Sequence, residues 1–321
     1  MVGKYVTETI LADAAGIARA AQILRDGGLV AVPTETVYGL AARADSDEAV
    51  ARIYEAKGRP SFNPLIVHVR DAKQARELAE LPHDASLIAE HFWPAPLTLV
   101  VPLWPSAQLA GAVTAGLPTV ALRSPDHPAM QELLKACEFP LAAPSANRSG
   151  FVSPTSADHV AATLDGRIDL ILDDGRPCAN GLESTILAIR EDGSWDELRP
   201  GPVDLDSLHR YYWDAPREMS AGQGAIEAPG QLASHYAPGK PVRLNATEVA
   251  PDDFMVGFGA VAGDCTLSAS GSLTEAASRL YACLHEGSRS EKPRIAVAPI
   301  PEQGIGIAIN DRLRRAATPP D

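Results

Sequence analysis

The sequence predicts an α/β fold divided into two domains, and three observations lead to that prediction. Short apolar runs alternate along the chain with segments whose apolar residues recur at helical spacing. Turn residues separate neighbouring apolar runs, which favours a twisted mixed sheet flanked by helices over a purely parallel one. The chain has 321 residues, which suffices for two hydrophobic cores, and its periodic pattern lapses between residues 214 and 240.

The first predicted domain, residues 1–213, carries clear helix and strand signals. In its first helix Ile17, Ala20 and Leu24 share one face and Gly27 follows the end, whereas Ser46 caps the second helix. Helices are expected at 13–25, 46–56, 72–81, 85–92, 129–136 and 156–164. Strands are expected at 29–32, 65–69, 97–101, 119–122, 140–142, 168–172 and 184–189. This order is typical of a sheet covered by helices.

A linker and a second, smaller domain are predicted to follow. Residues 214–240 are rich in Gly, Ala, Ser and Pro, and they exceed the usual length of a connection inside a domain. We therefore expect this segment to be a linker or an active-site lid. Residues 241–321 contain expected strands at 242–244, 254–258 and 294–297 and expected helices at 273–285 and 305–316. They predict a small C-terminal α/β (Rossmann-like) domain, although no glycine-rich dinucleotide fingerprint or P-loop lysine occurs in it.

Composition limits the possible functions. Hydrophobic residues make up 45% of the chain and the net charge is −13, which argues against a surface that binds nucleic acid throughout. The four cysteines form no C-x-x-C pair, so neither structural zinc nor a disulfide framework is expected. The sequence starts without an apolar signal segment and has no run long enough to span a membrane. A cytoplasmic protein without membrane contact is the expectation.

The segment 29–68 carries the strongest functional signal. An apolar run ends at Pro33 and is followed directly by hydroxyl groups and a carboxylate. A second group of polar residues precedes and ends the next apolar run. The residues concerned are Thr34, Glu35, Thr36 and Tyr38, then Lys57, Arg59, Asn63 and His68. Polar side chains at strand ends, with two cations and an imidazole among them, suit recognition of an anionic ligand.

Three later clusters extend this signal. Arg123 ends a strand, where an ion pair with Asp126 is an alternative to a ligand contact. Ser145 follows a run of small residues, and Ser153 precedes a proline, a pattern that also caps helices and binds anions. Arg199 stands before Pro-Gly-Pro, on a stiff turn. Because no serine or cysteine is flanked as a nucleophile, the residues predict a cationic pocket for a phosphorylated ligand without covalent catalysis.

With these clusters in order, the sequence resembles the threonylcarbamoyl-AMP synthase family in its long form, which joins a YrdC-like domain to a linker and a C-terminal domain. The strings that carry the resemblance are PTETVYGL, KGRPSFNPLIVHV, FWPAPLTLVV, TVALRSPDHP, PLAAPSANRSG, SPTSADHV, ESTI, LRPGPV and IGIAINDRLRRAA. The resemblance implies an enzyme, a nucleotidyltransferase. It would combine L-threonine, bicarbonate and ATP into threonylcarbamoyl-AMP and pyrophosphate, for transfer by other proteins to adenosine in tRNA.

The resemblance also implies roles for individual residues. Those expected to hold L-threonine are Thr36, His68, Arg123, Ala143 (through its backbone) and Ser184. Those expected to hold ATP are Arg59, Asn63, Thr119, Ser145, Ser153 and Arg199. Lys57 and Arg59 are the expected catalytic cations, with Mg²⁺ arriving with ATP and no protein side chain predicted as a metal ligand. Ser234, His235 and Tyr236 are expected in the lid, where Ala233 stands in place of a tyrosine that relatives often have.

Two alternatives belong to other functional classes. YrdC-like domains have a concave basic surface, so a module that binds double-stranded RNA or tRNA is one alternative. The other is a carbamoyl transferase like the hydrogenase-maturation proteins that contain this domain. The acidic net charge of −13 disfavours the first, so weak or no direct nucleic-acid binding is expected. The second would need acylphosphatase and zinc-finger regions, which nothing in this chain resembles.

Overall fold

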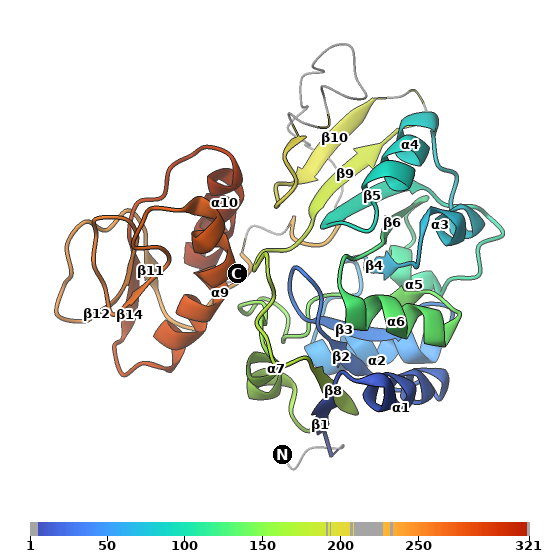
Figure 1. Cartoon of the computed structure of the whole chain (residues 1–321), viewed down its shortest axis with the longest axis horizontal. Coiled ribbons are helices and arrows are strands. Elements are labelled where there is room, and N and C mark those ends of the chain that lie inside the picture. Colours follow the sequence, from blue (N-terminus) through green and yellow to red (C-terminus); the bar gives the residue numbers. More distant parts are fainter. Residues whose placement is uncertain are drawn as a thin grey trace.

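The protein is described by a computed structural model that covers residues 6–190, 192, 194–205, 208, 227–231 and 234–319. Within these residues the chain forms a large α/β domain and a smaller α/β domain beside it (Figure 1). The predicted boundary at residues 213 and 214, most of the predicted linker and the Ala233 position lie outside the described residues.

A mixed sheet forms the centre of the large domain, as the sequence predicts. Among the described residues, ten strands take the order β1 (Glu8–Leu11), β8 (Leu170–Asp173), β2 (Val30–Val32), β3 (Gly39–Arg43), β7 (Leu141–Ala142), β4 (Ile66–His68), β6 (Thr119–Arg123), β5 (Leu97–Pro102), β9 (Thr185–Ile189), β10 (Trp195–Arg199). Parallel pairs, such as β4 with β6, lie among antiparallel ones, such as β5 with β6. Strands distant in sequence are therefore neighbours, and their ends bring distant side chains together.

Helices cover both faces of this sheet. On one face, apolar side chains of α1 (Ala14–Arg25) and α6 (Pro128–Cys137) pack on β2, β3, β7 and β8. On the other, α2 (Asp47–Lys57), α4 (His83–Phe92) and α7 (Ala157–Leu164) contribute to the main core. Two shorter helices, α3 (Ala72–Leu78) and α5 (Gly111–Thr114), add to that core. Over β4, β5, β6 and β9 the linker residue Ala228 completes a separate small apolar cluster.

Local signals account for the helices that the sequence predicts correctly. The carboxylate of Asp13 accepts the N–H of Gly16 at 2.8 Å and so caps α1, whose Ile17, Ala20 and Leu24 are buried. The hydroxyl of Ser46 caps α2 in the same way. Gly58 ends α2 in a left-handed conformation, with φ at 60°.

Strands β1 and β3 of the large domain were not expected from the sequence, and neither was the short strand Cys265–Thr266 of the smaller domain. Strand β1 lies at the edge of the sheet and three of its four residues are exposed, so it has no alternating pattern. Strand β3 is mostly Gly, Leu and Ala, residues with weak strand preference, and it forms because it pairs with β2 and β7. The polar loop at residues 34–38 is therefore the turn of a hairpin between β2 and β3.

The smaller domain has the predicted α/β organisation. Its sheet is parallel and takes the order β11 (Val242–Arg243), β14 (Arg294–Val297), β12 (Asp253–Gly257), β13 (Cys265–Thr266). Helices α9 (Leu273–Arg289) and α10 (Ile305–Ala317) lie between this sheet and the large domain (Figure 1). Its apolar core continues into Val37, Val152 and Leu182 of the large domain. The two domains therefore share a buried interface formed by α9 and α10.

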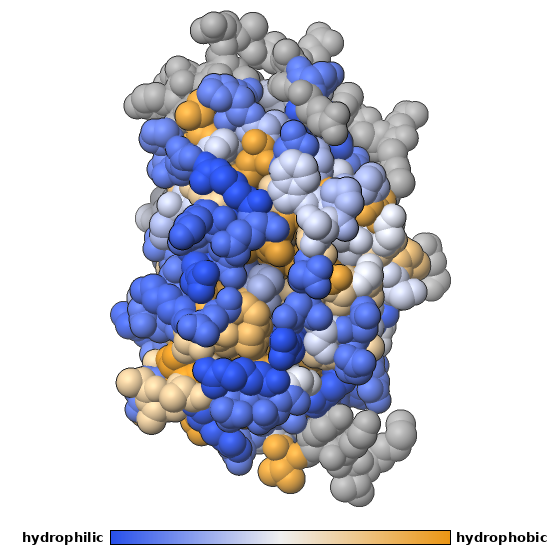
Figure 2. Space-filling view, turned by 90° about the vertical axis from the view of Figure 1, so that its right-hand side faces the viewer, coloured by the Kyte–Doolittle hydropathy of each residue, from blue (hydrophilic) through white to orange (hydrophobic). Residues whose placement is uncertain are grey.

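The outer surface of the large domain is mainly polar. On the face shown in Figure 2, hydrophilic residues predominate and apolar residues lie in small groups between them. In the part of the chain that the structure describes, no helix has the length and apolar character needed to cross a bilayer.

Candidate active site

A buried cavity lies where the large domain meets the linker. Strand ends and loops of the large domain form its walls, and Pro229, Gly230, His235 and Tyr236 of the linker close it. The predicted site residues that line it are Thr36, Arg59, His68, Arg123, Ala143, Ser145, Arg199, His235 and Tyr236. The cavity volume is about 40 Å³, which is room for a few water molecules.

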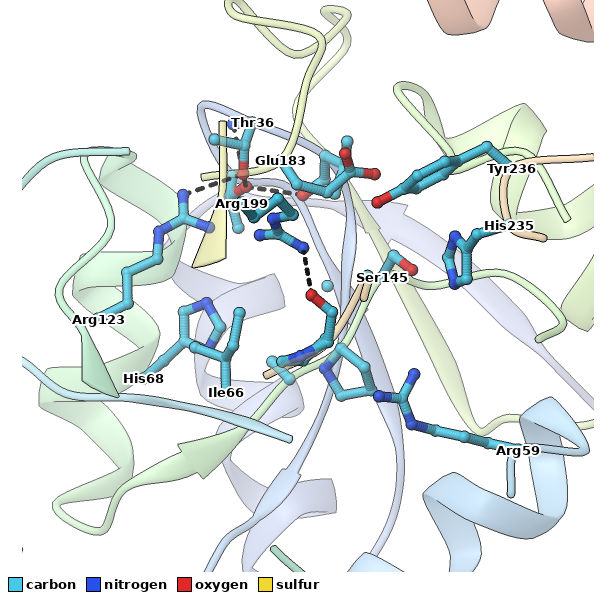
Figure 3. Close-up of a pocket in the computed structure, with 17 residues that line it drawn as sticks. Thr36, Arg59, Ile66, His68, Arg123, Ser145, Glu183, Arg199, His235 and Tyr236 are labelled. Carbon is cyan, nitrogen blue, oxygen red and sulfur yellow. Dashed lines mark hydrogen bonds between the residues drawn. The ribbon is translucent and has the colours of Figure 1, made fainter. Parts of the chain in front are cut away.

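Arg123 and His68 lie side by side at one end of the cavity because β4 and β6 are parallel and in register at these two residues. Arg123 donates to the hydroxyl of Thr36 at 3.0 Å (Figure 3). Its Nη2 also lies 2.6 Å from Oε1 of Glu35, in a buried ion pair. The alternative partner, Asp126, is exposed. The hairpin turn at residues 34–38, and not Asp126, thus supplies the counter-charge of Arg123.

Arg59 and Ser145 lie on the opposite side of the cavity from Arg123, with Arg199 between the two groups (Figure 3). Arg59 follows the end of α2 and donates to the carbonyls of Asn63 and Pro64 at 3.2 and 2.8 Å. Burial lowers the pKa of Arg59 to about 10, so the guanidinium remains charged at neutral pH. This end of the cavity therefore presents a positive charge held by loop carbonyls.

Arg199 is fixed by the backbone on two sides. It donates to the carbonyl of Ser184 at 3.1 and 3.0 Å and to that of Pro229 at 3.3 Å. Gly230 permits this arrangement, because a Cβ there would lie 3.1 Å from the Cδ of Arg199 and its φ is 89°. The guanidinium thus connects the large domain to the linker.

Arg59 and Arg199 have an unusual electrostatic environment. Both side chains are buried, and no carboxylate of the described residues forms an ion pair with either of them. A buried charge is costly unless it is paired, and guanidinium groups match phosphate oxygens well. The Nε of Arg123 and the Nδ1 of His235 also have no hydrogen-bond partner among the described residues. The cavity is thus suited to a ligand with several negative charges.

Lys57 lies behind the cavity and is not part of its lining. Its ammonium donates to the carbonyls of Ser145 and Asn147. Burial first, and then the neighbouring Arg59, hold the pKa of Lys57 well below its ordinary value. In this conformation Lys57 fixes the loop that carries Ser145, and its expected role in catalysis stays a prediction.

The remaining predicted substrate-binding residues do not line the cavity. Ser184 is fully buried, and its hydroxyl is 2.7 Å from that of Thr98. Ser153 donates to Glu183 at 2.6 Å. Asn63 is buried and holds Arg59 through its carbonyl, whereas Thr119 begins β6, at the opposite end of that strand from Arg123. Their contacts with substrates stay predictions.

Two linker residues occupy the predicted lid position. His235 and Tyr236 are buried at the cavity wall, and their rings meet edge to face at a centroid distance of 4.2 Å. Ala237 pairs with Phe151 in an isolated bridge that attaches the segment to the large domain. Ser234 instead donates to the carbonyl of Thr318 at 3.0 Å and faces the C-terminal helix. The described part of the linker therefore lies against the site, while its action as a lid remains a prediction.

Sequence reasoning missed the contribution of two carboxylates. Glu35 was noted as part of a polar segment, but its pairing with Arg123 was not expected. Glu183 lines the cavity and accepts a hydrogen bond from Arg312 of the smaller domain at 2.8 Å. The position of Glu183 next to Ser184 in the string ESTI was the available signal. Its partner lies in another domain, so no local pattern could reveal the pairing.

Buried histidines predict that stability falls in weak acid. Burial is the main cause that lowers the pKa of His68 and His235 to about 3 and that of His285 to about 4, from 6.5. The unfolded chain therefore binds more protons than the native protein from about pH 6.5 down to about pH 4. Stability is full above that window and decreases as the pH falls through it, by about 1.4 kcal/mol per pH unit for each histidine.

Urea unfolding at about pH 7 and about pH 5 measures this loss. His285→Gln should reduce the pH dependence, whereas His83→Gln, a change of an exposed histidine, should leave it as it is. Equal unfolding free energies at the two pH values would contradict the prediction.

Family models match both domains of the chain. A model described as "Telomere recombination" matches residues 22–201, and one described as "Threonylcarbamoyl-AMP synthase, C-terminal domain" matches residues 203–318. The first model thus covers the large sheet except β1, and the second covers the part with α9 and α10.

Relatives of full length match the whole arrangement. The threonylcarbamoyl-AMP synthase of Bacillus subtilis (strain 168) is 40% identical, over 97% of this chain and 96% of the relative. That of Pyrococcus abyssi is 37% identical, over 93% of each chain. The crystal structure of P. abyssi Sua5 complexed with L-threonine has a TM-score of 0.83 and 34% identity, covering 98% of this chain and 97% of that chain. This chain therefore belongs to the threonylcarbamoyl-AMP synthase family, in its two-domain form.

Proposed function

We propose that this chain is a nucleotidyltransferase that makes threonylcarbamoyl-AMP and pyrophosphate from L-threonine, bicarbonate and ATP. The observation that carries the proposal is the buried cavity in which Arg59 and Arg199 form no ion pair with a carboxylate of the described residues. The triphosphate of ATP is a ligand of matching charge. Family membership supports the synthase function over an RNA-binding module or a carbamoyl transferase.

L-Threonine is assigned to the end of the cavity that holds Arg123. A guanidinium can form a paired hydrogen bond with the substrate carboxylate, and the unpartnered Nε of Arg123 leaves one of its donors available. His68, with a pKa of about 3, is neutral at neutral pH and serves as a hydrogen-bond partner rather than a second cation. The L-threonine complex of the P. abyssi relative supports a threonine site in this family.

ATP is assigned to the end that holds Arg59, Ser145 and Arg199. The amine of threonine and bicarbonate form a carbamate, whose oxygen bonds to the α-phosphorus as the bond to pyrophosphate breaks. Such a transfer needs positioning and charge neutralisation more than a protein nucleophile. Arg59 and Arg199 would neutralise charge on the phosphates, and the closed cavity would exclude water that hydrolyses the product.

Mg²⁺ enters this proposal as part of the ATP substrate. In the described residues, no group of three His, Cys, Asp or Glu side chains could hold a metal ion. The two carboxylates nearest the cavity, Glu35 and Glu183, are both paired with arginine. We propose that the ion arrives bound to the phosphates of ATP. The proposed product would pass to tRNA threonylcarbamoyl-transferase proteins in the cytoplasm, with weak or no direct binding of this chain to nucleic acid.

The test is a product analysis with the full chain. Incubation with ATP, L-threonine and radiolabelled bicarbonate should release pyrophosphate and transfer the label to an adenylate. Omitting threonine or bicarbonate should each abolish pyrophosphate release. Formation of ADP and inorganic phosphate, or release that does not depend on threonine, would contradict the proposed reaction.

A further inference from the structure

Glu183 connects the cavity to the smaller domain. Its carboxylate accepts hydrogen bonds from Arg312 Nε at 2.8 Å, from the Tyr281 hydroxyl at 2.9 and 3.0 Å, and from the Ser153 hydroxyl at 2.6 Å. Arg312 belongs to α10 and Tyr281 to α9, and neither residue lines the cavity. Both side chains that the smaller domain contributes here are fully buried.

The backbone near Glu183 allows this contact. Gly181 has a φ of 68°, and a Cβ at this position would lie 2.5 Å from the carbonyl oxygen of Ala277 in α9. A side chain at residue 181 would therefore push α9 away and separate Tyr281 from Glu183. The close approach of α9 to Gly181 is therefore needed for the hydrogen bond from Tyr281 to the Glu183 carboxylate.

The same two residues hold other parts of the cavity. Arg312 Nη2 donates to the carbonyl of Pro200, directly after Arg199, at 2.9 Å. The ring of Tyr236 stacks on that of Tyr281 at a centroid distance of 5.7 Å, and the guanidinium carbon of Arg312 lies 5.4 Å from the Tyr236 ring centroid. Arg312 thus contacts the turn that follows Arg199, and Arg312 and Tyr281 together contact the ring of Tyr236 in the linker.

Stability alone does not explain a buried ion pair at this place. Taking both charges out of water is costly, and apolar residues of similar volume often stabilise as well or better. The Glu183–Arg312 pair does impose a geometry, since both partners use several directed hydrogen bonds. Burial alone would raise the pKa of Glu183, but Arg312, Arg199 and the Ser153 hydroxyl lower it to about 2, so the carboxylate stays ionised.

We propose that Arg312 and Tyr281 of the smaller domain are positioning residues for the synthase reaction. They hold Glu183 and the Pro200 turn, and in this way they place Ser184 and Arg199 for substrate binding. The proposal rests on the proposed function, to which it adds a task for the smaller domain. The smaller domain would hold active-site residues in position without contacting the substrates itself.

The experiment compares full-length variants in the synthase assay. Arg312→Met should lower kcat/KM for L-threonine roughly 10- to 100-fold, the range found when a residue that orients a metal ligand is removed. Arg312→Lys keeps the charge but not the fork of donors, so its kcat/KM should lie between those of the wild type and Arg312→Met. Tyr281→Phe should lower kcat/KM less than Arg312→Met does. Arg314→Gln is the matched control on the same helix, because Arg314 pairs with Glu302 on the surface.

A double variant shows whether Arg312→Met loses activity because the protein unfolds or because the active-site residues are misplaced. Glu183→Gln with Arg312→Met removes both charges of the Glu183–Arg312 pair, and Asp311, the other partner of Arg312, keeps its ion pair with Arg315. Thermal stability should therefore recover toward that of the wild type while kcat/KM stays low. Amide hydrogen exchange gives a readout independent of activity. The N–H of Val203, bonded to the Thr185 hydroxyl at 3.0 Å, should exchange faster in Arg312→Met than in Arg314→Gln.

The outcomes distinguish this proposal from the proposed function. A wild-type protein that makes no threonylcarbamoyl-AMP overturns the function, and faster exchange at Val203 in Arg312→Met would still support the positioning contact. An active wild type together with a folded Arg312→Met variant of unchanged kcat/KM overturns the positioning role, as does recovery of full activity in the double variant.

Discussion

Replacing His235 and Tyr236 together by alanine is expected to reduce threonylcarbamoyl-AMP synthesis at least about 100-fold, because small displacements at a reacting centre have effects of this size. Both side chains are buried at the cavity wall, and His235 Nδ1 has no hydrogen-bond partner among the described residues. The cavity has a volume of about 40 Å³, and we expect the linker to move away to admit the substrates and to return to exclude water.

Synthesis should fall while the large domain stays folded, since its own cores contain neither residue. Initial rates and thermal unfolding of the same samples measure the two effects. His83→Ala, a change of an exposed histidine, is the control and should keep the wild-type rate. Deleting residues 228–238 should be at least as damaging as the double replacement.

Limited proteolysis tests the movement itself. The linker should be cut in the free enzyme and protected by ATP with threonine. If a fragment of residues 1–214 were fully active, the linker could not be a lid.

Arg123→Ala is expected to weaken L-threonine binding by about 2–5 kcal/mol, the usual cost of removing one partner of a buried charge pair. This corresponds to roughly a 30- to 5,000-fold higher dissociation constant. The physical reason is that the substrate carboxylate would lose the guanidinium that is proposed to bind it. Calorimetric titration with threonine measures the change directly.

The ion pair with Glu35 requires a second variant. Arg123→Ala alone leaves the Glu35 carboxylate buried and unpaired, which lowers stability independently of binding. Adding Glu35→Gln should restore stability but not threonine affinity. Arg59→Ala should show the opposite selectivity, with weaker ATP binding and threonine affinity less affected. An unchanged threonine affinity in the double variant would mean that Arg123 serves only as the partner of Glu35.

Helices and most strands could be predicted because their signals are local. The face formed by Ile17, Ala20 and Leu24 and the cap at Ser46 act over a few residues, and the structure places α1 and α2 accordingly. Strand β1 escaped prediction because it lies mostly exposed at the sheet edge and has no alternating pattern, and β3 because its Gly, Leu and Ala residues have little strand preference. Pairing with β8, and with β2 and β7, stabilises them, and such pairing depends on residues far away in the sequence.

The candidate site likewise has features that the sequence could predict and features that it could not. The sequence by itself determined which residue types follow the strands, and hence that Arg59, His68, Arg123 and Arg199 belong to a polar, cationic site. Only the tertiary structure decided their neighbours. It pairs Arg123 with Glu35 through the β2–β3 hairpin, and it brings Arg312 to Glu183 across 129 residues of chain. Local propensity acts over a few residues, whereas the partner of a buried charge is set by sheet order and domain packing, which no short segment encodes.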